Sequence, residues 1–309
     1  MKVKYGTLLV LSAGTAWGIS SVSGQYLMSH GMAVNLLTSL RLLISGIVIT
    51  FLAFLIQKEK FISLIKKKEN ILTLFIFSIL GLLMNQLAFL SAIKFTNAGT
   101  ATVLQYLSPV LILLYVSLTK KQLPTFAELL SILFAISGTL IMSTHGQITH
   151  MAMTPKGLFW GLLSAFTYSV YIILPAQLIK KWGSLSVIGL GMLIAGIIFP
   201  IITKSWQYHV SYDSKTILAL FGIIGVGTVF AYTVFLMGTT IVGPVKGSLL
   251  ACVEPIASVV FAIVIIKQHF YPIDFLGMTL ILAAVLIISL RDKVINKEAV
   301  KIVRDDIEI

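Results

Sequence analysis

The chain has 309 residues, of which 58% are hydrophobic and 11% charged, and its mean hydropathy is +1.00. A soluble globular domain carries about 25% charged residues, so this composition excludes one and predicts a protein of membrane-spanning helices. The net charge of +12 comes from lysines in short clusters between apolar segments, a distribution that does not favour nucleic-acid binding.

Ten apolar segments have roughly the 17–25 residues that cross a bilayer. The first is already long enough to span, so we expect an uncleaved helix rather than a signal peptide. Such long runs exclude a membrane β-barrel, whose strands are about 10 residues of alternating polarity. The segments are 6–28, 33–56, 71–93, 98–119, 126–144, 156–179, 184–203, 216–238, 245–266 and 273–290.

Ten spans place both ends of the chain on one side of the membrane. If that side is the cytoplasm, it receives 17 of the 23 Lys and Arg residues, and the opposite side receives five. The remaining one, Arg41, lies inside the second segment. The positive-inside rule therefore predicts a multi-pass cell-membrane protein with cytoplasmic N- and C-termini.

Two prolines interrupt corresponding segments of the chain. Pro109 lies within the apolar run 98–119 and Pro255 within 245–266, 146 residues apart. Other residues repeat at the same offset: Phe89-Leu90 with Phe235-Leu236, Leu104 with Leu250, Lys121-Gln122 with Lys267-Gln268, and Glu128 with Asp274. Because proline removes a backbone hydrogen bond and breaks a helix, paired breaks in two halves indicate a binding site in a membrane transporter.

Because each half has an odd number of spans, five, the first half starts on the inner side of the membrane and the second half starts on the outer side. The predicted fold is therefore an all-α polytopic membrane protein, with ten transmembrane helices arranged as two inverted five-helix repeats. The expected division is a first repeat at 1–145, a second at 146–290 and a cytoplasmic polar tail at 291–309, without regular structure. This architecture suits alternating access to a solute held between the repeats near the midplane.

Several of these residues resemble the motifs of EamA-type transporters in the drug/metabolite transporter superfamily. Trp17-Gly18 resembles the family's "WG", Arg41 its buried arginine, and Glu254-Pro255 its "EP" in the ninth helix. The stretch Asn97–Ala101 followed by Leu107-Ser108-Pro109 resembles the signature of the fourth helix. The resemblance covers the whole chain as two tandem domains, and implies ten helices and transport of small organic solutes such as amino acids, amines or other metabolites.

The chain departs from that family pattern at two helix ends. The family often ends its fourth and ninth helices with Gly-Glu-Arg, where this sequence has Lys121-Gln122 and Lys267-Gln268. A role for that terminal glutamate is therefore not carried over. The resemblance specifies neither the solute nor the direction of transport.

Glu254 is the carboxylate placed deep in a span, where a charge costs about 2.5–3.5 kcal/mol on insertion scales. It is interpreted either as a proton-coupling or cation-binding group, or as an ion-pair partner of Arg41 that holds helices together. Arg41 in turn either binds a substrate carboxylate or serves as a structural counter-ion.

The other candidate solute contacts are polar or aromatic side chains inside spans. Asn85, Gln105 and Tyr106 either contact solute or hydrogen-bond helices together. Gln105 and Ala251 each precede a proline by four residues, so their carbonyls lose a helical partner and are free to face the solute. Trp17, Tyr168 and Tyr171 lie mid-span, where Trp17 and Tyr168 form a facing aromatic pair for a flat or cationic solute, or pack as core.

The sequence favours a transporter over two other classes. An intramembrane enzyme would need a nucleophile with a base or a metal motif, and no His-Glu-x-x-His, Gly-x-Ser-x-Gly or nucleotide-binding loop is visible, so no catalytic residue, metal or cofactor is expected. All five histidines map to outer loops or helix ends, without metal-site spacing. One asymmetric carboxylate does not suit a channel, which would show rings of like residues.

The prediction is a secondary active transporter of a small organic metabolite, an amino acid, amine or similar zwitterion or cation. Glu254 is the candidate for proton coupling, and Pro109 and Pro255 are the candidate gating breaks. The alternative is a facilitative carrier or exchanger of an anionic metabolite held by Arg41, without proton coupling. The expected partners are the solute and the lipid bilayer, without nucleic acid, and the chain acts as a monomer or homodimer.

Overall fold

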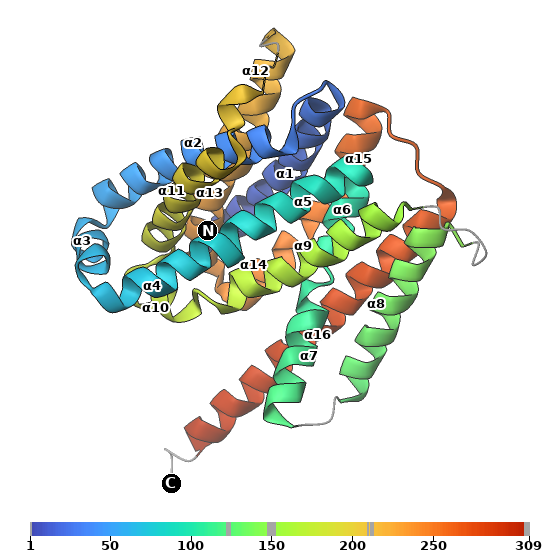
Figure 1. Ribbon diagram of the computed structural model, residues 1–309. Helices are drawn as coiled ribbons and strands as arrows, with labels where there is room; N and C mark the ends of the chain where they lie inside the picture. The colour runs from blue at the N-terminus through green and yellow to red at the C-terminus, as the bar shows by residue number, and fades with distance from the viewer. Residues whose placement is uncertain (1, 122–124, 147–152, 209, 211–212, 306–309) are drawn as a thin grey trace.

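A computed structural model describes residues 2–121, 125–146, 153–208, 210 and 213–305, and within them every regular element is a helix (Figure 1). The first half contains α1 (Lys2–Ser29), α2 (Val34–Ile56), α3 (Lys58–Lys66), α4 (Lys68–Ile76), the π-helix η1 (Phe77–Leu83), α5 (Met84–Phe95), α6 (Ala98–Gln105), α7 (Ser108–Lys120) and α8 (Phe126–Thr144). The second contains α9 (Pro155–Ile173), α10 (Ala176–Trp182), α11 (Ser184–Thr203), the 3-10 turn η2 (Ser205–Gln207), α12 (Ser214–Leu220), the π-helix η3 (Phe221–Phe230), α13 (Ala231–Val242), α14 (Pro244–Ala251), α15 (Val253–Ile266) and α16 (Pro272–Asp305).

Each of the ten predicted segments coincides with helix. Six helices of the described chain are long and apolar enough to cross a membrane, or seven if the bent pair α9–α10 forms one span. The segments at 245–266 and 273–290 contain the shorter apolar helices Val253–Ile266 and Pro272–Ile288, and 6–28 lies in α1. A multi-pass helical membrane protein is therefore supported, whereas the count of ten spans is not confirmed.

The structure has a helix boundary before each of the two prolines. The first break lies between Gln105, where α6 ends, and Ser108, where α7 begins. The second lies between Ala251, where α14 ends, and Val253, where α15 begins. In both halves the helix ends four residues before the proline, as expected from the loss of its N–H group.

Three features differ from the sequence expectations. The segment 156–179 is not one straight helix, because Pro175 breaks it into α9 and α10 with a 41° bend. The connection after α2 forms a short helix of its own, α3, which was not predicted. The tail predicted to lack regular structure continues α16 as helix to Asp305, in a stretch without glycine or proline. Gln122, His150 and His209 lie outside the described residues.

Two π-helical segments occur at corresponding places in the halves and were not predicted. Both η1 and η3 lie in the third long helix of their half, and Gly81 of η1 is 146 residues before Gly227 of η3. In η3, the Thr228 hydroxyl donates to the carbonyl oxygen of Ile223, five residues earlier, at 2.9 Å. Because π-bulges are frequent at functional sites, both segments are candidates for a functional role.

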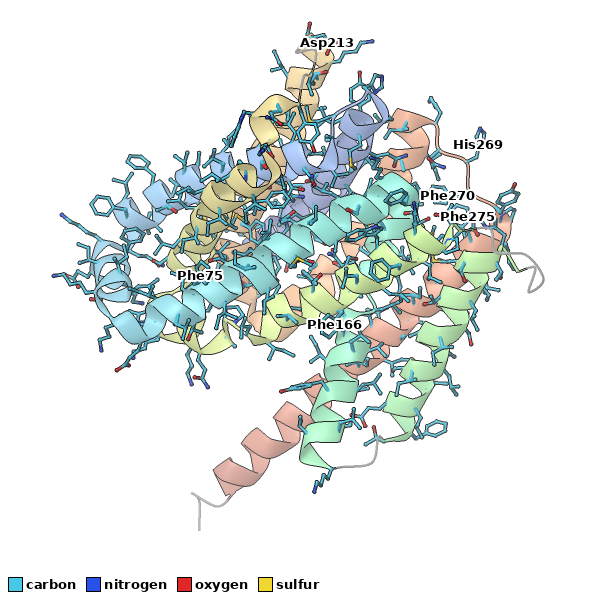
Figure 2. All side chains as sticks on the ribbon, viewed as in Figure 1. Phe75, Phe166, Asp213, His269, Phe270 and Phe275 are labelled. Carbon is cyan, nitrogen blue, oxygen red and sulfur yellow. The ribbon has the colours of Figure 1, made fainter. Side chains whose placement is uncertain are left out.

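The packing is apolar outside and contains small polar groups inside. Phe75 and Phe166 are 46% and 57% exposed on the outer surface of their helices (Figure 2), whereas Ser45, Ser164 and Ser258 are fully buried. Large apolar side chains are exposed on most helices. Contact with water would be unfavourable for them, whereas in a membrane lipid covers them.

The helices α8 and α16 lie side by side at one edge of the molecule (Figure 1). Both begin with the same capping interaction: Glu128 accepts a hydrogen bond from the Thr125 N–H, and Asp274 accepts one from the Tyr271 N–H. The predicted correspondence of Glu128 and Asp274 thus has a physical basis, since each carboxylate satisfies an unpaired donor at a helix start.

Candidate functional site

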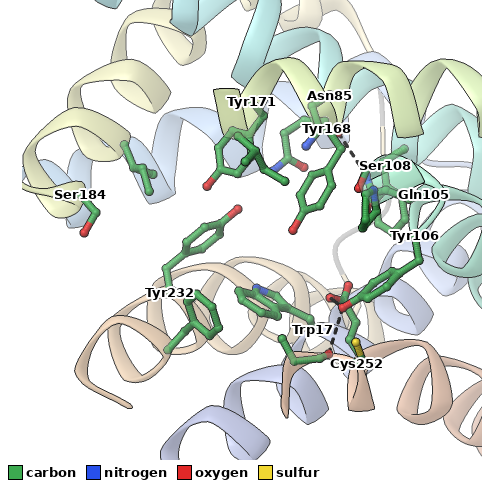
Figure 3. A pocket seen from close by; sticks show the side chains of 18 of the residues that line it. Trp17, Asn85, Gln105, Tyr106, Ser108, Tyr168, Tyr171, Ser184, Tyr232 and Cys252 are labelled. Carbon is green, nitrogen blue, oxygen red and sulfur yellow. Dashed lines mark hydrogen bonds between the residues drawn. The ribbon is translucent and has the colours of Figure 1, made fainter. Parts of the chain in front are cut away.

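A cavity of about 460 Å³ lies where the two broken helices face each other (Figure 3). The break of the first half contributes Gln105, Tyr106, Ser108 and Pro109 to its lining, and the break of the second half contributes Ala251, Cys252 and Glu254. The volume falls within the range of about 300–1,000 Å³ found for small-molecule sites.

The structure brings nine of the ten predicted site residues together in this lining. They are Trp17, Arg41, Asn85, Gln105, Tyr106, Pro109, Tyr168, Tyr171 and Glu254. Pro255 is buried in the first turn of α15 and is not part of the lining.

Glu254 sits in the first turn of α15, directly after the break. Its Oε2 lies 3.0 Å from the hydroxyl of Tyr106, which comes from the break of the other half. Within the described chain, Arg41 and Glu254 do not form the ion pair considered from the sequence, although both line the cavity. The Arg41 Nε donates instead to the Thr228 hydroxyl at 3.0 Å, so the π-helix η3 provides its partner.

The Ala251 carbonyl loses its helical partner at the break before Pro255, and it was expected to be free to face the solute. In the structure it has a hydrogen-bond partner instead. It lies 2.9 Å from the same Tyr106 hydroxyl that approaches Glu254. That hydroxyl carries one proton, which it can donate to only one of the two oxygens at a time. A protonated Glu254 would donate to Tyr106, whose own proton would then satisfy Ala251.

Two amides predicted at the site hydrogen-bond to each other across the first half. Gln105 Nε2 donates to Asn85 Oδ1 at 3.1 Å, so this pair joins α5 to α6 while also lining the cavity. Two nearby lining atoms, Gln86 Oε1 and Ser108 Oγ, are buried without a hydrogen-bond partner among the described residues. Such atoms cost free energy unless something in the cavity binds them.

Aromatic side chains form opposite walls of the cavity. On one side, Tyr168 and Tyr171 of α9 stack with ring centroids 5.7 Å apart. On the other, the Trp17 ring of α1 contacts Tyr232 at 5.6 Å and Phe235 at 5.1 Å. Figure 3 shows Trp17 and Tyr168 on opposite sides of the open space, the arrangement expected of a facing pair.

Sequence reasoning missed Tyr232, Phe235 and Phe89 of the lining. The repeat register contained a signal for the first of them, since Tyr232 is 146 residues after Gln86, beside the predicted Asn85. Phe235 likewise matches Phe89 in that register. No group of His, Cys, Asp or Glu that could hold a metal ion occurs in the described part of the chain.

A polar contact at Gln25, here called the closure at Gln25, joins three elements outside the cavity lining. Gln25 of α1 donates to the side chain of Gln268 at 3.0 Å and accepts from the Ala98 N–H at 2.7 Å. It thereby connects α1 to the start of α6 and to the residues that follow α15. The cavity lining extends in the other direction, toward Ser184 at the start of α11.

Comparisons with known proteins agree with this architecture. The model of the EamA-like transporter family matches the chain twice, at residues 4–144 and 155–290. The inner membrane transporter YicL of Salmonella typhimurium, itself named uncharacterized, is 37% identical over 92% of this chain and 95% of its own. The uncharacterized transporter YetK of Bacillus subtilis is 25% identical over 95% of this chain and 89% of its own.

A solved crystal structure shares the fold, with a TM-score of 0.62 over 92% of this chain and 97% of that one, at 18% identity. The matches to the family model cover most of the chain, and the relative from Salmonella covers nearly all of it. Neither comparison indicates an enzyme. The chain is a member of the EamA-like transporter family, in the drug/metabolite transporter superfamily.

Proposed function

We propose that this protein is a secondary transporter that moves a small organic zwitterion or cation across the cell membrane by alternating access. Its ten helices would form two inverted repeats with both termini in the cytoplasm, and the name of the Salmonella relative supports the inner membrane as its location. The observation that carries the proposal is the cavity bordered by both helix breaks, with Glu254 in its lining. In transporters, discontinuous helices typically provide the solute site.

Glu254 and the aromatic walls support a cationic group on the solute. Glu254 is not neutralised by an ion pair within the described chain, so its carboxylate is available to an ammonium group. The rings of Trp17, Tyr168 and Tyr232 border the same space and can add cation–π attraction, which is strongest for desolvated cations.

The shared proton of Tyr106 supplies a route from ionisation to helix position. With Glu254 ionised, Tyr106 donates to the carboxylate and the Ala251 carbonyl is left unpaired. With Glu254 protonated, both Glu254 and Ala251 are satisfied through Tyr106. Proton binding would therefore stabilise the observed contact between the two breaks, and release of the proton to water when a cationic solute binds to the carboxylate would weaken it.

The closure at Gln25 supports movement between two states. In the observed state the closure is formed, and the cavity extends toward the opposite end of the bundle. The reverse state requires this closure to separate and the elements around Ser184 to approach each other. Rocking of the two repeats about the broken helices would do both.

The test is binding followed by transport. Purified protein is screened by thermal shift against amino acids, amines, sugars and organic acids, because a ligand that binds the folded state raises the apparent melting temperature. A stabilising solute is then loaded into proteoliposomes, and counterflow of its labelled form is measured. Counterflow that is slowed in Glu254→Gln and unchanged in the exposed Glu59→Gln supports the proposal, whereas stabilisation and counterflow confined to neutral sugars would refute it.

An anionic solute is the second candidate, favoured by Arg41. Its guanidinium borders the cavity and its hydrogen-bond partner is the neutral Thr228, so it can still receive a carboxylate. Matched compounds separate the candidates: an amino acid, its decarboxylated amine and its deaminated acid. If the acid alone stabilises the protein and Arg41→Gln removes that effect, the anionic candidate replaces the first.

A further inference from the structure

The short helices α3 and α10 meet at one end of the bundle (Figure 1), and six lysines lie on them or directly beside them in sequence. Three candidate spans begin or end beside them: α2 ends at Ile56, a second span starts at Glu69, and a third starts at Ser184. The group therefore lies at the level where helices leave the hydrocarbon and meet lipid headgroups. We name it the lysine cluster, and its members are Lys58, Lys60, Lys66, Lys67, Lys180 and Lys181.

The backbone that carries the lysine cluster is fixed by apolar packing. On α3, Phe61 and Leu64 are 8% and 1% exposed, and Leu64 shares a core with Leu178 and Trp182 of α10. All six lysines are nevertheless exposed. The short helix α3 thus holds its charges in place at the surface.

No ion pair compensates the charge of the cluster within the described residues. The described chain places no carboxylate in an ion pair with any of the six lysines, although Glu59 and Glu69 lie nearby in sequence. Two of the ammonium groups converge on one ring: Lys181 Nζ lies 5.1 Å and Lys67 Nζ 5.8 Å from the centroid of Trp182. Two cations held beside the same ring attract an anion between them.

Trp182 provides a second observation that points to a ligand. Its side chain is 8% exposed, and its Nε1 is buried without an acceptor among the described residues. A buried indole N–H normally finds a partner. The ring that gathers two lysines therefore also has an unused hydrogen-bond donor.

We propose that the lysine cluster binds the phosphate headgroup of an anionic phospholipid, with Lys67, Lys181 and Trp182 at its centre. A lipid fits better than a free phosphate, because Leu55 and Ile56 at the end of α2 are 60% and 63% exposed beside the cluster and offer an apolar surface to acyl chains. Basic groups on the ends of transmembrane helices recognise such headgroups by charge.

A topology signal alone would produce lysines here without any lipid preference. The experiment separates the two. The full-length protein in neutral detergent receives dioleoylphosphatidylglycerol, dioleoylphosphatidylcholine or inorganic phosphate, and its apparent melting temperature is measured. We expect phosphatidylglycerol to raise it by about 4 °C and the other two to leave it within about 1 °C.

Variants locate the effect on the protein. Lys67→Gln/Lys181→Gln is expected to lose most of the shift, and Lys67→Arg/Lys181→Arg to keep it. The control Lys94→Gln/Lys156→Gln removes the same charge from the other ends of the α4–α5 and α9–α10 helices and should retain the full shift. The single variants Lys67→Gln and Lys181→Gln, both at exposed positions, replace the double variant if it does not fold.

Three results would overturn the proposal. Equal stabilisation by phosphatidylcholine would show that the headgroup charge is irrelevant. Equal loss in both Gln double variants would show an effect of total charge only. A shift of the same size with inorganic phosphate would assign the cluster to a free anion.

Discussion

Tyr106 and Glu254 come from the helix breaks of opposite halves, and the Tyr106 hydroxyl lies 3.0 Å from Glu254 Oε2. The contact joins the carboxylate of the second break to the first break. Because the same hydroxyl is 2.9 Å from the Ala251 carbonyl oxygen, a change at Glu254 alters how both breaks are hydrogen-bonded. The first two predictions follow from this shared proton.

Glu254→Gln should fold and lose coupling. Removing a charge from mid-span relieves an insertion cost of about 2.5–3.5 kcal/mol, so we expect an unchanged or raised melting temperature. The glutamine amide has no titratable proton, so transport should become slower and its rate insensitive to pH. The measurement is counterflow across a pH series, and an unchanged rate and pH profile would remove Glu254 from the coupling mechanism.

Tyr106→Phe should slow transport without loss of the aromatic wall. The ring remains, while the one proton that Glu254 and the Ala251 carbonyl share is removed, at a cost of about 1.5–3 kcal/mol where it is donated to the charged carboxylate. We expect a rate at least about 10-fold lower and a shifted pH profile. The matched control is Tyr115→Phe, which removes a hydroxyl from an exposed tyrosine on α7. Equal effects of the two variants would contradict the shared-proton mechanism.

Pro109→Ala and Pro255→Ala should each slow transport while leaving the protein at least as stable. Either change restores an N–H group and allows the helix to continue through a break that borders or adjoins the cavity, since proline disfavours a helix interior by about 3 kcal/mol. Pro200→Ala is the control, because Pro200 lies inside α11, away from the cavity lining. The idea of a site at broken helices fails if both variants transport at the wild-type rate.

The sequence predicted what depends on local chemistry or on burial alone. A proline lacks an N–H group whatever surrounds it, so its position in the chain is enough to place the breaks at Gln105 and Ala251. Charged and amide groups in spans avoid lipid, so Arg41, Glu254 and Asn85 were expected to face one interior. The exposed apolar surface follows from the same argument.

The rest depends on how helices rotate about their axes and pack. Arg41 has two potential partners at depth, and only the position of η3 decides that it donates to Thr228 rather than to Glu254. Tyr232 and Phe235 resemble any aromatic residue of a span until α13 is placed beside α1. The π-helices have no characteristic composition by which the sequence could reveal them. The helix α3 has only nine residues, too few for a periodic apolar pattern to stand out among its lysines.

Gly46→Ala and Gly196→Ala should destabilise the protein through the α2–α11 contact. A Cβ at Gly46 would lie 2.5 Å from the backbone nitrogen of Leu193, and one at Gly196 would lie 2.5 Å from that of Leu43. Backbone cannot move aside as a flexible side chain can, so the helices must separate, at a cost of about 1–3 kcal/mol. We expect each variant to lower the melting temperature in detergent by several degrees, about 2–4 °C per kcal/mol for a chain near this size. The control Ile197→Leu changes a half-exposed side chain on the same helix and should have no effect. Wild-type stability in both glycine variants would mean that α2 and α11 do not approach as closely as described. The position of Arg41, which α2 carries, would then also be in error.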